Sequence, residues 1–514
     1  MVYTNYKNAG SEGVVKTLFI GRSRELNVLN RLYQSSKAEF LILYGRRRIG
    51  KTRLITHWME TVRPRAFFWV AEPTSSVDQL RSFSQALFRF ESPNSQPPQD
   101  MSYGDWRTAF ETLARSAEKG RTAVIIDEFT YLLAAEPAVS AYLQHAWDHA
   151  LSQSNLLLIL SGSHLGMMQR QVLSYQAPLY GRSTANLLLQ PLPFGVTSDF
   201  FPGYQADERV AIYAMLGGVP AYWERFSPLR SVSENIRAEL LDYSASFHDE
   251  PRLLLSDFLH QPHNYVSIFR AIANGAGTPK EIARLSGLDE KHIPQYLNVL
   301  AETGFIARKV PVTQPLTSRL GRHFITDPFL RFYYRFLARR QAQLALGVED
   351  QALEEIRRHL LDFIGTYTWE ELCQEWLLRA SGQQRLPFSP DQVGSAWTRK
   401  AQVDVVGINS MEKTLILGEC KWSPKAMDRE VLEDLVKKTD EIVPGEGRWR
   451  VYYLGFARGG WTREAKAFAA DYEKLKAQGG NWPAVGMSLL DLKQVDQDLV
   501  EWSKGKEFEI ILEI

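Results

Sequence analysis

The segment GRRRIGKT, residues 45–52, constrains the fold of this chain more than any other stretch. It matches the pattern G-x-x-x-x-G-K-[ST], whose glycines let the backbone wrap around an anion with its N–H groups pointing inward. The apolar run FLILY, residues 40–44, comes directly before it, and apolar residues at helical spacing follow in TRLITHWM, residues 52–59. A buried strand, a loop and a helix in this order predict a phosphate-binding loop in a parallel α/β fold.

The residues of this loop have distinct expected roles toward a bound nucleotide and its metal ion. Lys51 is expected to reach the β- and γ-phosphates, and the hydroxyl of Thr52 to hold Mg²⁺. The helix that begins here adds positive potential at its N-terminus. The three arginines fill variable positions, so the motif itself does not require them. We therefore expect ATP and Mg²⁺ as cofactors, bound by Gly45, Arg46, Arg48, Ile49, Gly50, Lys51, Thr52 and Arg53.

A second apolar run, RTAVIIDEFTYLL at residues 121–133, brings two carboxylates to the end of a predicted strand. Beside a phosphate loop, the first of such a pair can hold Mg²⁺ through water and the next can orient the attacking water. We assign the first role to Asp127 and the second to Glu128. Acidic pairs at strand ends are common, so this prediction depends on the phosphate loop that precedes the pair.

Polar residues also follow the third predicted strand, NLLLILSGS at residues 155–163. Ser161 or Ser163 is a candidate sensor of the γ-phosphate, and the alternative is a polar helix cap or turn. In the next loop, Arg182 is a candidate catalytic arginine that stabilises developing charge, in cis or in trans. A solvent-exposed arginine without such a role is the alternative there.

Six short motifs follow one another along the chain: FIGRSREL (19–26), GRRRIGKT, IIDEF, LSGS, PLYGR and GGVPAYW (217–223). In this order they resemble the archaeal-type P-loop ATPases, a group within the AAA+ and STAND-related NTPases. The resemblance covers residues 16–225 and implies an ATPase core with a parallel sheet. It also implies that the adenine side of the nucleotide is flanked by Gly21, Arg22, Glu25 and Pro220. Judged locally, the Gly-Gly-x-Pro segment is no more than a turn.

The middle of the chain predicts three further modules. Residues 226–262 read as the helical lid of an AAA+ module, and residues 327–350 as a helical connector. Between them, residues 263–326 have the order of a winged helix, with a helix, a turn, a second and third helix and a two-stranded wing. The second of these helices begins at TPKEIARLSG, with Thr278 as its N-cap, and the wing is expected from FIARKVPV and RHFITD.

Whether this module contacts DNA is left open by its charges. The predicted recognition helix carries Asp289, Glu290 and Glu302, which makes a poor phosphate-binding face. The predicted wing is more basic, with Arg308, Lys309, Arg319 and Arg322. DNA contact and a packing or regulatory role over the ATPase both fit this pattern.

The last predicted domain, residues 351–514, carries a second chemical pattern. QVDVVGINSMEKTLILGECKW, residues 402–422, reads as two apolar strands around a polar turn. Because side chains alternate along a strand, Glu419 and Lys421 share one face, and a hairpin can bring Asp404 across from them. Two carboxylates and an ammonium suit Mg²⁺-dependent phosphodiester hydrolysis, with Lys421 positioning or helping to deprotonate the attacking water.

This trio resembles the D-(x)n-(D/E)-x-K signature of the PD-(D/E)XK, restriction-endonuclease-like nucleases, although the proline usual before the first aspartate is missing. That family implies a further glutamate from a preceding helix, for which YTWEELCQEWLL offers Glu370 or, less favoured, Glu371. The expected metal ligands of the chain are thus Thr52 and Asp127 in one site, and Glu370, Asp404 and Glu419 in the other. An E-x-K pair on an exposed strand, engaged in a solvated salt bridge, is the alternative.

A further strand at residues 449–461 carries Arg458, which we interpret as solvated rather than as lining a phosphate path.

Bulk properties narrow the classes that remain. A chain of 514 residues with 45% hydrophobic and 23% charged residues predicts an α/β multidomain protein, preceded by a flexible tail at residues 1–15. Its net charge of +1 indicates no overall basic field, and its two cysteines indicate a reducing compartment. The first residues, MVYTNYKNAGSEGVVKTLF, show no charged-then-apolar signal pattern, so we expect a cytoplasmic protein. No apolar run approaches the ~20 residues that span a bilayer, so no membrane partner is expected.

Two functional hypotheses share the ATP site. In the first, an ATP-binding and ATP-hydrolysing core is coupled to a Mg²⁺-dependent nuclease-like domain that acts on DNA. In the second, the chain is a nucleotide-gated switch or a partner-remodelling ATPase whose last domain binds without cutting. A protein partner or homo-oligomer is compatible with both. The complete trio at Asp404, Glu419 and Lys421 favours the first hypothesis, and the near-neutral net charge of +1 favours the switch.

Overall fold

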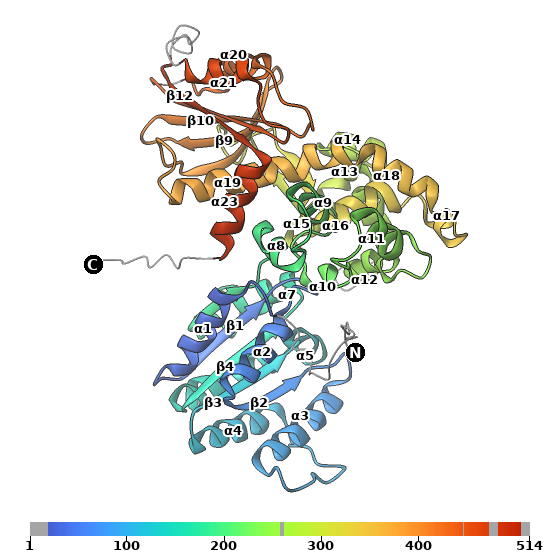
Figure 1. Cartoon of the computed structure of the whole chain (residues 1–514). Coiled ribbons are helices and arrows are strands. Elements are labelled where there is room, and N and C mark those ends of the chain that lie inside the picture. The colour runs from blue at the N-terminus through green and yellow to red at the C-terminus, as the bar shows by residue number, and fades with distance from the viewer. Residues whose placement is uncertain (1–18, 257–261, 446, 472–481, 505–514) are drawn as a thin grey trace. The chain divides into compact units, whose positions relative to one another are not determined.

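The computed structural model describes residues 19–256, 262–445, 447–471 and 482–504 (Figure 1). The predicted tail at residues 1–15 lies outside this part of the chain. By its contacts the chain forms two compact units, which divide mainly between Leu189 and Gln190. Residues 46–49 and 164–166 are counted with the second, C-terminal unit. The sequence-derived boundaries at 225, 262, 326 and 350 all fall inside that unit.

The N-terminal unit is built on a five-stranded parallel sheet with the order β2-β3-β4-β1-β5. Its strands are β1 (Glu39–Tyr44), β2 (Arg65–Val70), β3 (Thr122–Asp127), β4 (Leu156–Gly162) and β5 (Ala185–Leu188). Every residue of β3 and β4 is buried, which explains why these strands are continuous apolar runs rather than alternating ones. The strands predicted from the phosphate loop, from IIDEF and from LSGS are confirmed.

Amphipathic helices cover this sheet (Figure 1): α1 (Ser23–Gln34), α2 (Lys51–Val62), α3 (Ser76–Glu91), α4 (Trp106–Ser116), α5 (Phe129–Ala135), α6 (Val139–His149) and the short α7 (Leu165–Met168). Helices α3 and α4 bury an aromatic cluster that includes Phe83, Trp106 and Phe110 against Trp69 of β2. Since the strands are parallel, their carboxyl ends meet at one edge of the sheet. Tyr44, Asp127 and Gly162 end β1, β3 and β4 at that edge.

The first half of the C-terminal unit is helical, with α8 (Thr197–Phe200), α9 (Ala206–Leu216), α10 (Pro220–Trp223), α11 (Val232–Asn235), α12 (Glu250–Ser256), α13 (Pro262–Ala273), α14 (Pro279–Ser286) and α15 (Ile293–Glu302). Thr278 caps α14 through a capping box with Glu281, as its sequence predicts. After α15, β6 (Ile306–Lys309) and β7 (Arg322–Ile325) pair in antiparallel fashion. Three helices and a two-stranded hairpin thus follow one another at residues 262–325.

A long helical stretch leads into the last part of the chain. After α16 (Pro328–Phe332), η7 (Tyr333–Leu337) and α17 (Gln341–Ala345), helix α18 (Asp350–Phe363) runs through a π-helical turn, η8 (Ile364–Trp369), into α19 (Glu370–Gly382). Such a turn inside a helix changes the direction in which the following side chains project, and it is frequent at functional sites. Glu370 and Glu371, the candidates of the sequence, are the first two residues after it.

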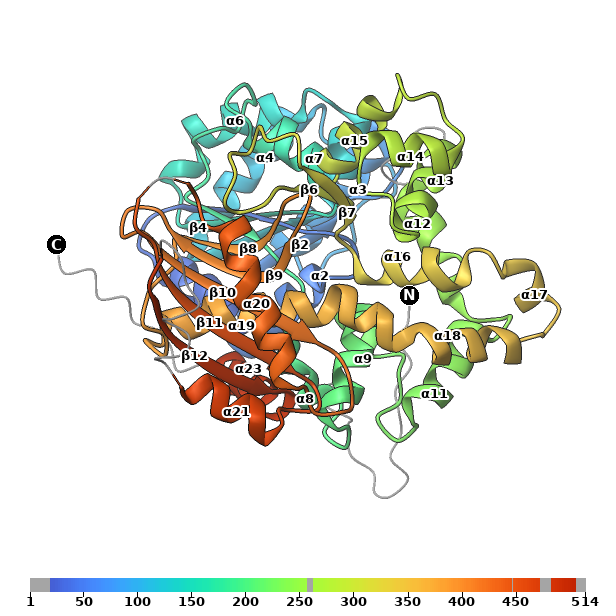
Figure 2. The ribbon, with the colours of Figure 1, turned by 90° about the horizontal axis from the view of Figure 1, so that it is seen from above.

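The second sheet of the C-terminal unit is mixed and has the order β12-β11-β10-β9-β8 (Figure 2). The strands β8 (Gln392–Trp397), β9 (Gln402–Asn409) and β10 (Thr414–Lys421) form an antiparallel meander. The strands β11 (Arg450–Ala457) and β12 (Ala484–Asp491) then add in parallel to β10. Helices α20 (Arg429–Ile442), α21 (Arg463–Ala470) and α23 (Leu492–Lys504) complete this part. The hairpin predicted at residues 402–422 is confirmed.

None of the helices in the part of the chain that the structure describes combines the length and the apolar character needed to cross a bilayer.

Candidate functional sites

The loop after β1 has the backbone of a phosphate cradle. Gly50 caps α2 with a φ of 96°, a left-handed conformation that glycine adopts without strain, and no atom lies near the position a Cβ would take there. Glycine at position 50 is therefore required by the backbone conformation and not by lack of space. Arg48 also has a positive φ of 63°. Lys51 is buried, and its Nζ donates a hydrogen bond of 2.9 Å to the carbonyl oxygen of Gly45, which folds the lysine back over the loop.

Two residues far apart in the sequence meet at the carboxyl edge of the sheet. The hydroxyl of Thr52 donates a 2.6 Å hydrogen bond to Oδ2 of Asp127, which is 1% exposed. The other carboxylate oxygen of Asp127 accepts the backbone N–H of Glu128 at 2.9 Å. Glu128 has a φ of 52°, a left-handed conformation that is uncommon outside glycine and is often found at functional sites.

The two serines after β4 differ in their surroundings. The hydroxyl of Ser163 donates a 2.6 Å hydrogen bond to Oε2 of Glu128. Ser161 is fully buried beside Leu43 of β1, and its hydroxyl has no hydrogen-bond partner among the described residues. The structure therefore brings Ser163, of the two sequence candidates, into direct contact with the second carboxylate.

The residues assigned through the family resemblance lie in both units. In the N-terminal unit, Gly21 has a φ of 79°, and Arg22, which is 6% exposed, forms a 3.0 Å ion pair with Glu25. In the C-terminal unit, Pro220 is the first residue of α10. Just before it, a Cβ on Gly218 would overlap the carbonyl oxygen of Leu192, so this glycine is required by close backbone packing.

The arginines of the phosphate loop have acidic partners within the C-terminal unit, with which they are counted. Arg46 forms an ion pair with Asp327 and lies 6.0 Å from the ring centroid of Tyr222. Arg48 pairs with Glu250 at 2.7 Å. Ile49, which follows Arg48 in the loop, is fully buried. Arg53, on the first turn of α2, is half-buried. These acidic partners could not be predicted from the sequence, because they lie some two hundred residues or more away along the chain.

Arg182, the candidate catalytic arginine, is paired in the N-terminal unit. Its guanidinium donates two hydrogen bonds to the carboxylate of Asp148 on α6, at 3.2 and 3.0 Å, and a third to the carbonyl oxygen of Tyr180. The ion pair with Arg182 holds the pKa of Asp148 below its usual range. A bidentate pair fixes the guanidinium, so any role at a phosphate requires this pair to open.

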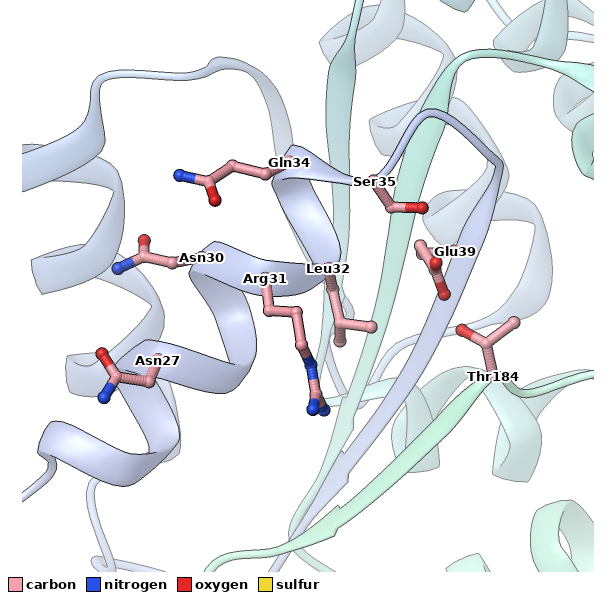
Figure 3. A pocket seen from close by; sticks show the side chains of 8 residues that line it. All are labelled: Asn27, Asn30, Arg31, Leu32, Gln34, Ser35, Glu39 and Thr184. Carbon is pink, nitrogen blue, oxygen red and sulfur yellow. The ribbon is translucent and has the colours of Figure 1, made fainter. Parts of the chain in front are cut away.

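An open pocket in the N-terminal unit lies at the other edge of the sheet (Figure 3). It is lined by α1 residues such as Asn27 and Asn30, by Glu39 at the start of β1 and by Thr184 just before β5. Glu39 and the phosphate loop stand at opposite ends of β1, which at about 3.3 Å per residue separates them by most of the sheet's height. This pocket is therefore distinct from the phosphate cradle.

The second candidate site is formed by β9 and β10. Their register pairs Gly418 with Val405, which brings Asp404 next to Glu419 at the following position. Oδ2 of Asp404 accepts the backbone N–H of Cys420 at 3.1 Å. Both carboxylates are less than 10% exposed, and Nζ of Lys421 donates a 2.6 Å hydrogen bond to Oε1 of Glu419. The structure thus brings together the three residues of the sequence pattern.

Glu370, the first residue of α19, is the third acidic candidate, and we name Glu370, Asp404 and Glu419 the carboxylate cluster. Burial, followed by the charge of Asp404, raises the pKa of Glu370 to about 9. Burial, followed by the charge of Glu419, raises the pKa of Asp404 to about 6.

Glu371, the less favoured sequence candidate, has a separate partner. Its carboxylate accepts two hydrogen bonds from Arg331, at 3.2 and 3.0 Å, and lies 3.7 Å from Nζ of Lys309. Burial raises the pKa of Glu371, but the charges of Arg331 and Lys309 outweigh it and the pKa is lowered overall. This ion pair accounts for Glu371 without a metal ion.

Lys438 on α20 is a residue of this site that the sequence reasoning missed. Its Nζ donates a 2.8 Å hydrogen bond to Oε2 of Glu419, so the two oxygens of Glu419 each accept from a different lysine. The amphipathic spacing of α20 was visible in the sequence, but it does not say which strand residue this helix meets. Arg458, interpreted above as solvated, instead pairs with Asp207 at 2.6 Å and lies 5.1 Å from the ring centroid of Trp422.

The residues of the carboxylate cluster can be compared with what Mg²⁺ requires. Among the described residues, no three or more histidine, cysteine, aspartate or glutamate side chains are grouped so that they could hold a metal ion. Mg²⁺ is usually held by one or two carboxylates, with water and substrate phosphate completing its shell. The adjacent, buried carboxylates of Asp404 and Glu419 fit that donor set.

The hairpin β6–β7 is attached to the edge of the second sheet. In the loop between its strands, the N–H of Val312 donates to the carbonyl oxygen of Ser395 on β8 at 3.0 Å. The indole of Trp397 donates to the carbonyl oxygen of Leu320 at 2.9 Å, and Arg322 lies over the Trp397 ring. These contacts hold the loop on β8.

The four basic side chains of this hairpin are therefore not equivalent. The guanidinium of Arg308 donates to the carbonyl oxygens of Leu316 and Ser318, which ties it to the loop itself. Lys309 lies beside Glu371 and Arg322 over Trp397. Arg319 is exposed.

Comparison with known proteins agrees with the phosphate cradle. A family described as an ATPase domain predominantly from Archaea matches residues 19–226. A second family, described as archaeal and bacterial proteins of unknown function, matches residues 333–432. Among solved structures, the Walker-type ATPase of Pyrococcus abyssi has 20% identity and a TM-score of 0.47, covering 64% of this chain and 99% of that one. The ORC2 protein of Aeropyrum pernix has 14% identity and a TM-score of 0.36, covering 68% and 98%.

An uncharacterized protein of Methanocaldococcus jannaschii is 31% identical over 438 residues, which cover 85% of this chain and 94% of that relative. An uncharacterized ATP-binding protein of the same organism is 49% identical over 43 residues, 8% of this chain and 73% of the relative. With the first relative matched over nearly its whole length and the ATPase domain matched across the phosphate cradle, the chain belongs to the archaeal-type family of P-loop ATPase proteins.

Proposed function

We propose that this chain is an ATP-hydrolysing P-loop ATPase coupled to a Mg²⁺-dependent nuclease-like domain that acts on DNA. The ATPase part rests on the phosphate cradle between β1 and α2 and on the carboxylates at the end of β3. The nuclease part rests on the carboxylate cluster with its lysines. The two parts are argued separately, because either could be correct without the other.

In the ATP site, the donors around Asp127 fit a magnesium nucleotide. Thr52 and Asp127 would hold the ion, whose bound form supplies charge neutralisation of the phosphates. Lys51 binds the β- and γ-phosphates, and the backbone N–H groups of the loop surround them. Glu128 orients the attacking water, and its 2.6 Å hydrogen bond from Ser163 holds the carboxylate in place.

The nuclease proposal depends above all on one observation, the convergence of Asp404, Glu419 and Lys421 at the end of the β9–β10 hairpin. Asp404 and Glu419 would hold Mg²⁺, which when bound supplies a water of lowered pKa and charge stabilisation at a phosphate. Lys421 positions that water. The order of this sheet, an antiparallel meander followed by parallel strands behind a helix, supports a restriction-endonuclease-like fold.

A DNA substrate is supported by the helices α13, α14 and α15 with the hairpin β6–β7, whose order is that of a winged helix. The exposed side chain of Arg319 on this hairpin suits a phosphate contact. The recognition helix itself remains acidic, so we propose backbone contact and not base reading.

Cleavage of supercoiled and linear DNA with Mg²⁺ or Mn²⁺ tests the nuclease part. The variant Glu419→Gln removes the carboxylate that accepts from both lysines, and the exposed Glu412→Gln on the turn of the same hairpin is the matched control. We expect cleavage by the wild type and by Glu412→Gln, and none by Glu419→Gln. If no form cuts DNA while ATP turnover remains, the last domain binds without cutting and the chain is a nucleotide-gated switch.

A further inference from the structure

Lys438 is not part of the signature that suggested the nuclease site, yet it contacts that site directly. It lies on α20, next to the buried stripe through which the helix packs on the sheet. Its ammonium and that of Lys421 approach Glu419 from two different elements, at 2.8 and 2.6 Å.

The exposed fractions of these three side chains differ. The side chain of Glu419 is 7% exposed, whereas those of Lys421 and Lys438 are 39% and 28% exposed. The two lysine side chains are therefore more accessible to a ligand from solution than the carboxylate of Glu419 that they contact.

The ammonium group of a lysine has enough hydrogen-bond donors to contact Glu419 and a phosphate at the same time. Each ammonium has three N–H donors, and the structure shows one of those of Lys438 used on Glu419. Without Lys438, the carboxylates of Asp404 and Glu419 would be accompanied by the single positive charge of Lys421. An anionic phosphate would then approach a site whose own charge repels it.

We propose that Lys438 is a phosphate-binding lysine of this site, which contacts the backbone of a nucleic acid strand while Lys421 serves the reacting water. This inference rests on the proposed nuclease-like function, and it adds a substrate contact on α20 that the D…E-x-K pattern does not contain. The ligand class is a phosphodiester, without regard to base sequence.

The neighbouring lysine provides a matched control. Lys437 precedes it on α20, but its side chain is 73% exposed and pairs with Asp434 at 3.0 Å on the helix surface. Replacing Lys437 or Lys438 changes the net charge of the protein equally. Of these two lysines, only Lys438 contacts Glu419 of the carboxylate cluster.

The test is the salt dependence of binding to a short fluorescein-labelled duplex and to its single strand, measured by anisotropy with the full chain. Ca²⁺ replaces Mg²⁺, since it takes the same oxygen ligands. We expect Lys438→Gln to lower the slope of log Kd against log salt by about 1. Lys438→Arg and Lys437→Gln should keep the wild-type slope.

A second comparison covers the case in which Lys438→Gln fails to fold because Glu419 loses a partner. The double variant Glu419→Gln/Lys438→Gln removes both members of the pair, and its slope is compared with that of Glu419→Gln alone. An unchanged slope in both comparisons, or a wild type that binds neither oligonucleotide, would overturn the inference. Wild-type binding without cleavage, with the slope lowered in Lys438→Gln, would instead overturn the nuclease activity and leave Lys438 as a phosphate contact.

Discussion

The hydroxyl of Thr52 donates a 2.6 Å hydrogen bond to Asp127, which joins the first turn of α2 to the end of β3. These are the hydroxyl and the carboxylate that we propose as holders of Mg²⁺ in the ATP site. In the sheet order β2-β3-β4-β1-β5, strand β4 lies between β3 and β1, the strand that leads through the phosphate loop into α2.

The first prediction concerns this pair. Replacing Thr52 by alanine removes the hydroxyl, and we expect the Mg²⁺ concentration for half-maximal ATP hydrolysis to rise by about 10-fold or more. Thr52→Ser keeps the hydroxyl and should behave like the wild type. Phosphate release measured across a Mg²⁺ titration checks both variants, and an equal Mg²⁺ requirement in wild type and Thr52→Ala would contradict the assignment.

The second prediction separates hydrolysis from nucleotide binding. Glu128→Gln keeps the shape of the side chain but cannot accept a proton, so ATP hydrolysis should fall by about 100-fold or more. Binding of a fluorescent ATP analogue should be retained, because Glu128 is assigned to the water and not to the phosphates. Glu118→Gln, an exposed change in the same unit, is the control. Loss of binding along with hydrolysis would show that Glu128 has a structural role instead.

The phosphate loop and its two neighbouring strands illustrate what the sequence alone could predict. A run such as FLILY before glycine-framed residues indicates a buried parallel strand, and the parallel arrangement then forces Asp127 and the serines after β4 to the same edge. The same holds for the β9–β10 hairpin, since the length of its turn and the alternation of its side chains bring Asp404 to Glu419. In these places local geometry determines the contact.

Other contacts depend on packing that no local pattern encodes. The partner of Lys438 depends on the rotation of α20 about its axis, which is set by its buried residues Leu432, Leu435 and Val436. The pairing of Arg182 with Asp148 needs the loop before β5 to lie along α6. The π-helical turn η8, which precedes Glu370, replaces what the sequence shows as an ordinary helix.

The third prediction distinguishes the basic residues of the β6–β7 hairpin. Arg319 is exposed, and its replacement by alanine should weaken DNA binding for all sequences alike and reduce the salt slope by about 1. Arg308 is tied to the carbonyl oxygens of its own loop, so Arg308→Ala should act mainly on thermal stability. Anisotropy and thermal melting of both variants check this order. A larger loss of DNA binding in Arg308→Ala than in Arg319→Ala would contradict it.

The fourth prediction tests the close packing beside Pro220. A methyl group at Gly218 would overlap the carbonyl oxygen of Leu192, so Gly218→Ala should lower the free energy of unfolding by about 1–3 kcal/mol. Gly203→Ala in the same unit meets no atom within 4 Å and should be nearly neutral. Urea unfolding of the two variants makes the comparison, and equal midpoints would show that the turn relaxes around the added methyl group.

The fifth prediction concerns Lys51, the lysine of the phosphate loop. Lys51→Ala removes the buried ammonium that is assigned to the phosphates, and ATP hydrolysis should fall by about 100-fold or more. The exposed Lys37→Ala in the same unit should leave hydrolysis unchanged.

The central claim, an ATPase coupled to DNA cleavage, is tested most directly by the initial rate of DNA cleavage with and without ATP in the wild type and in Lys51→Ala. We predict that ATP changes the rate in the wild type and has no effect in Lys51→Ala, while Lys37→Ala follows the wild type. Cleavage that is the same in all three proteins, with or without ATP, would contradict coupling and leave two independent activities on one chain.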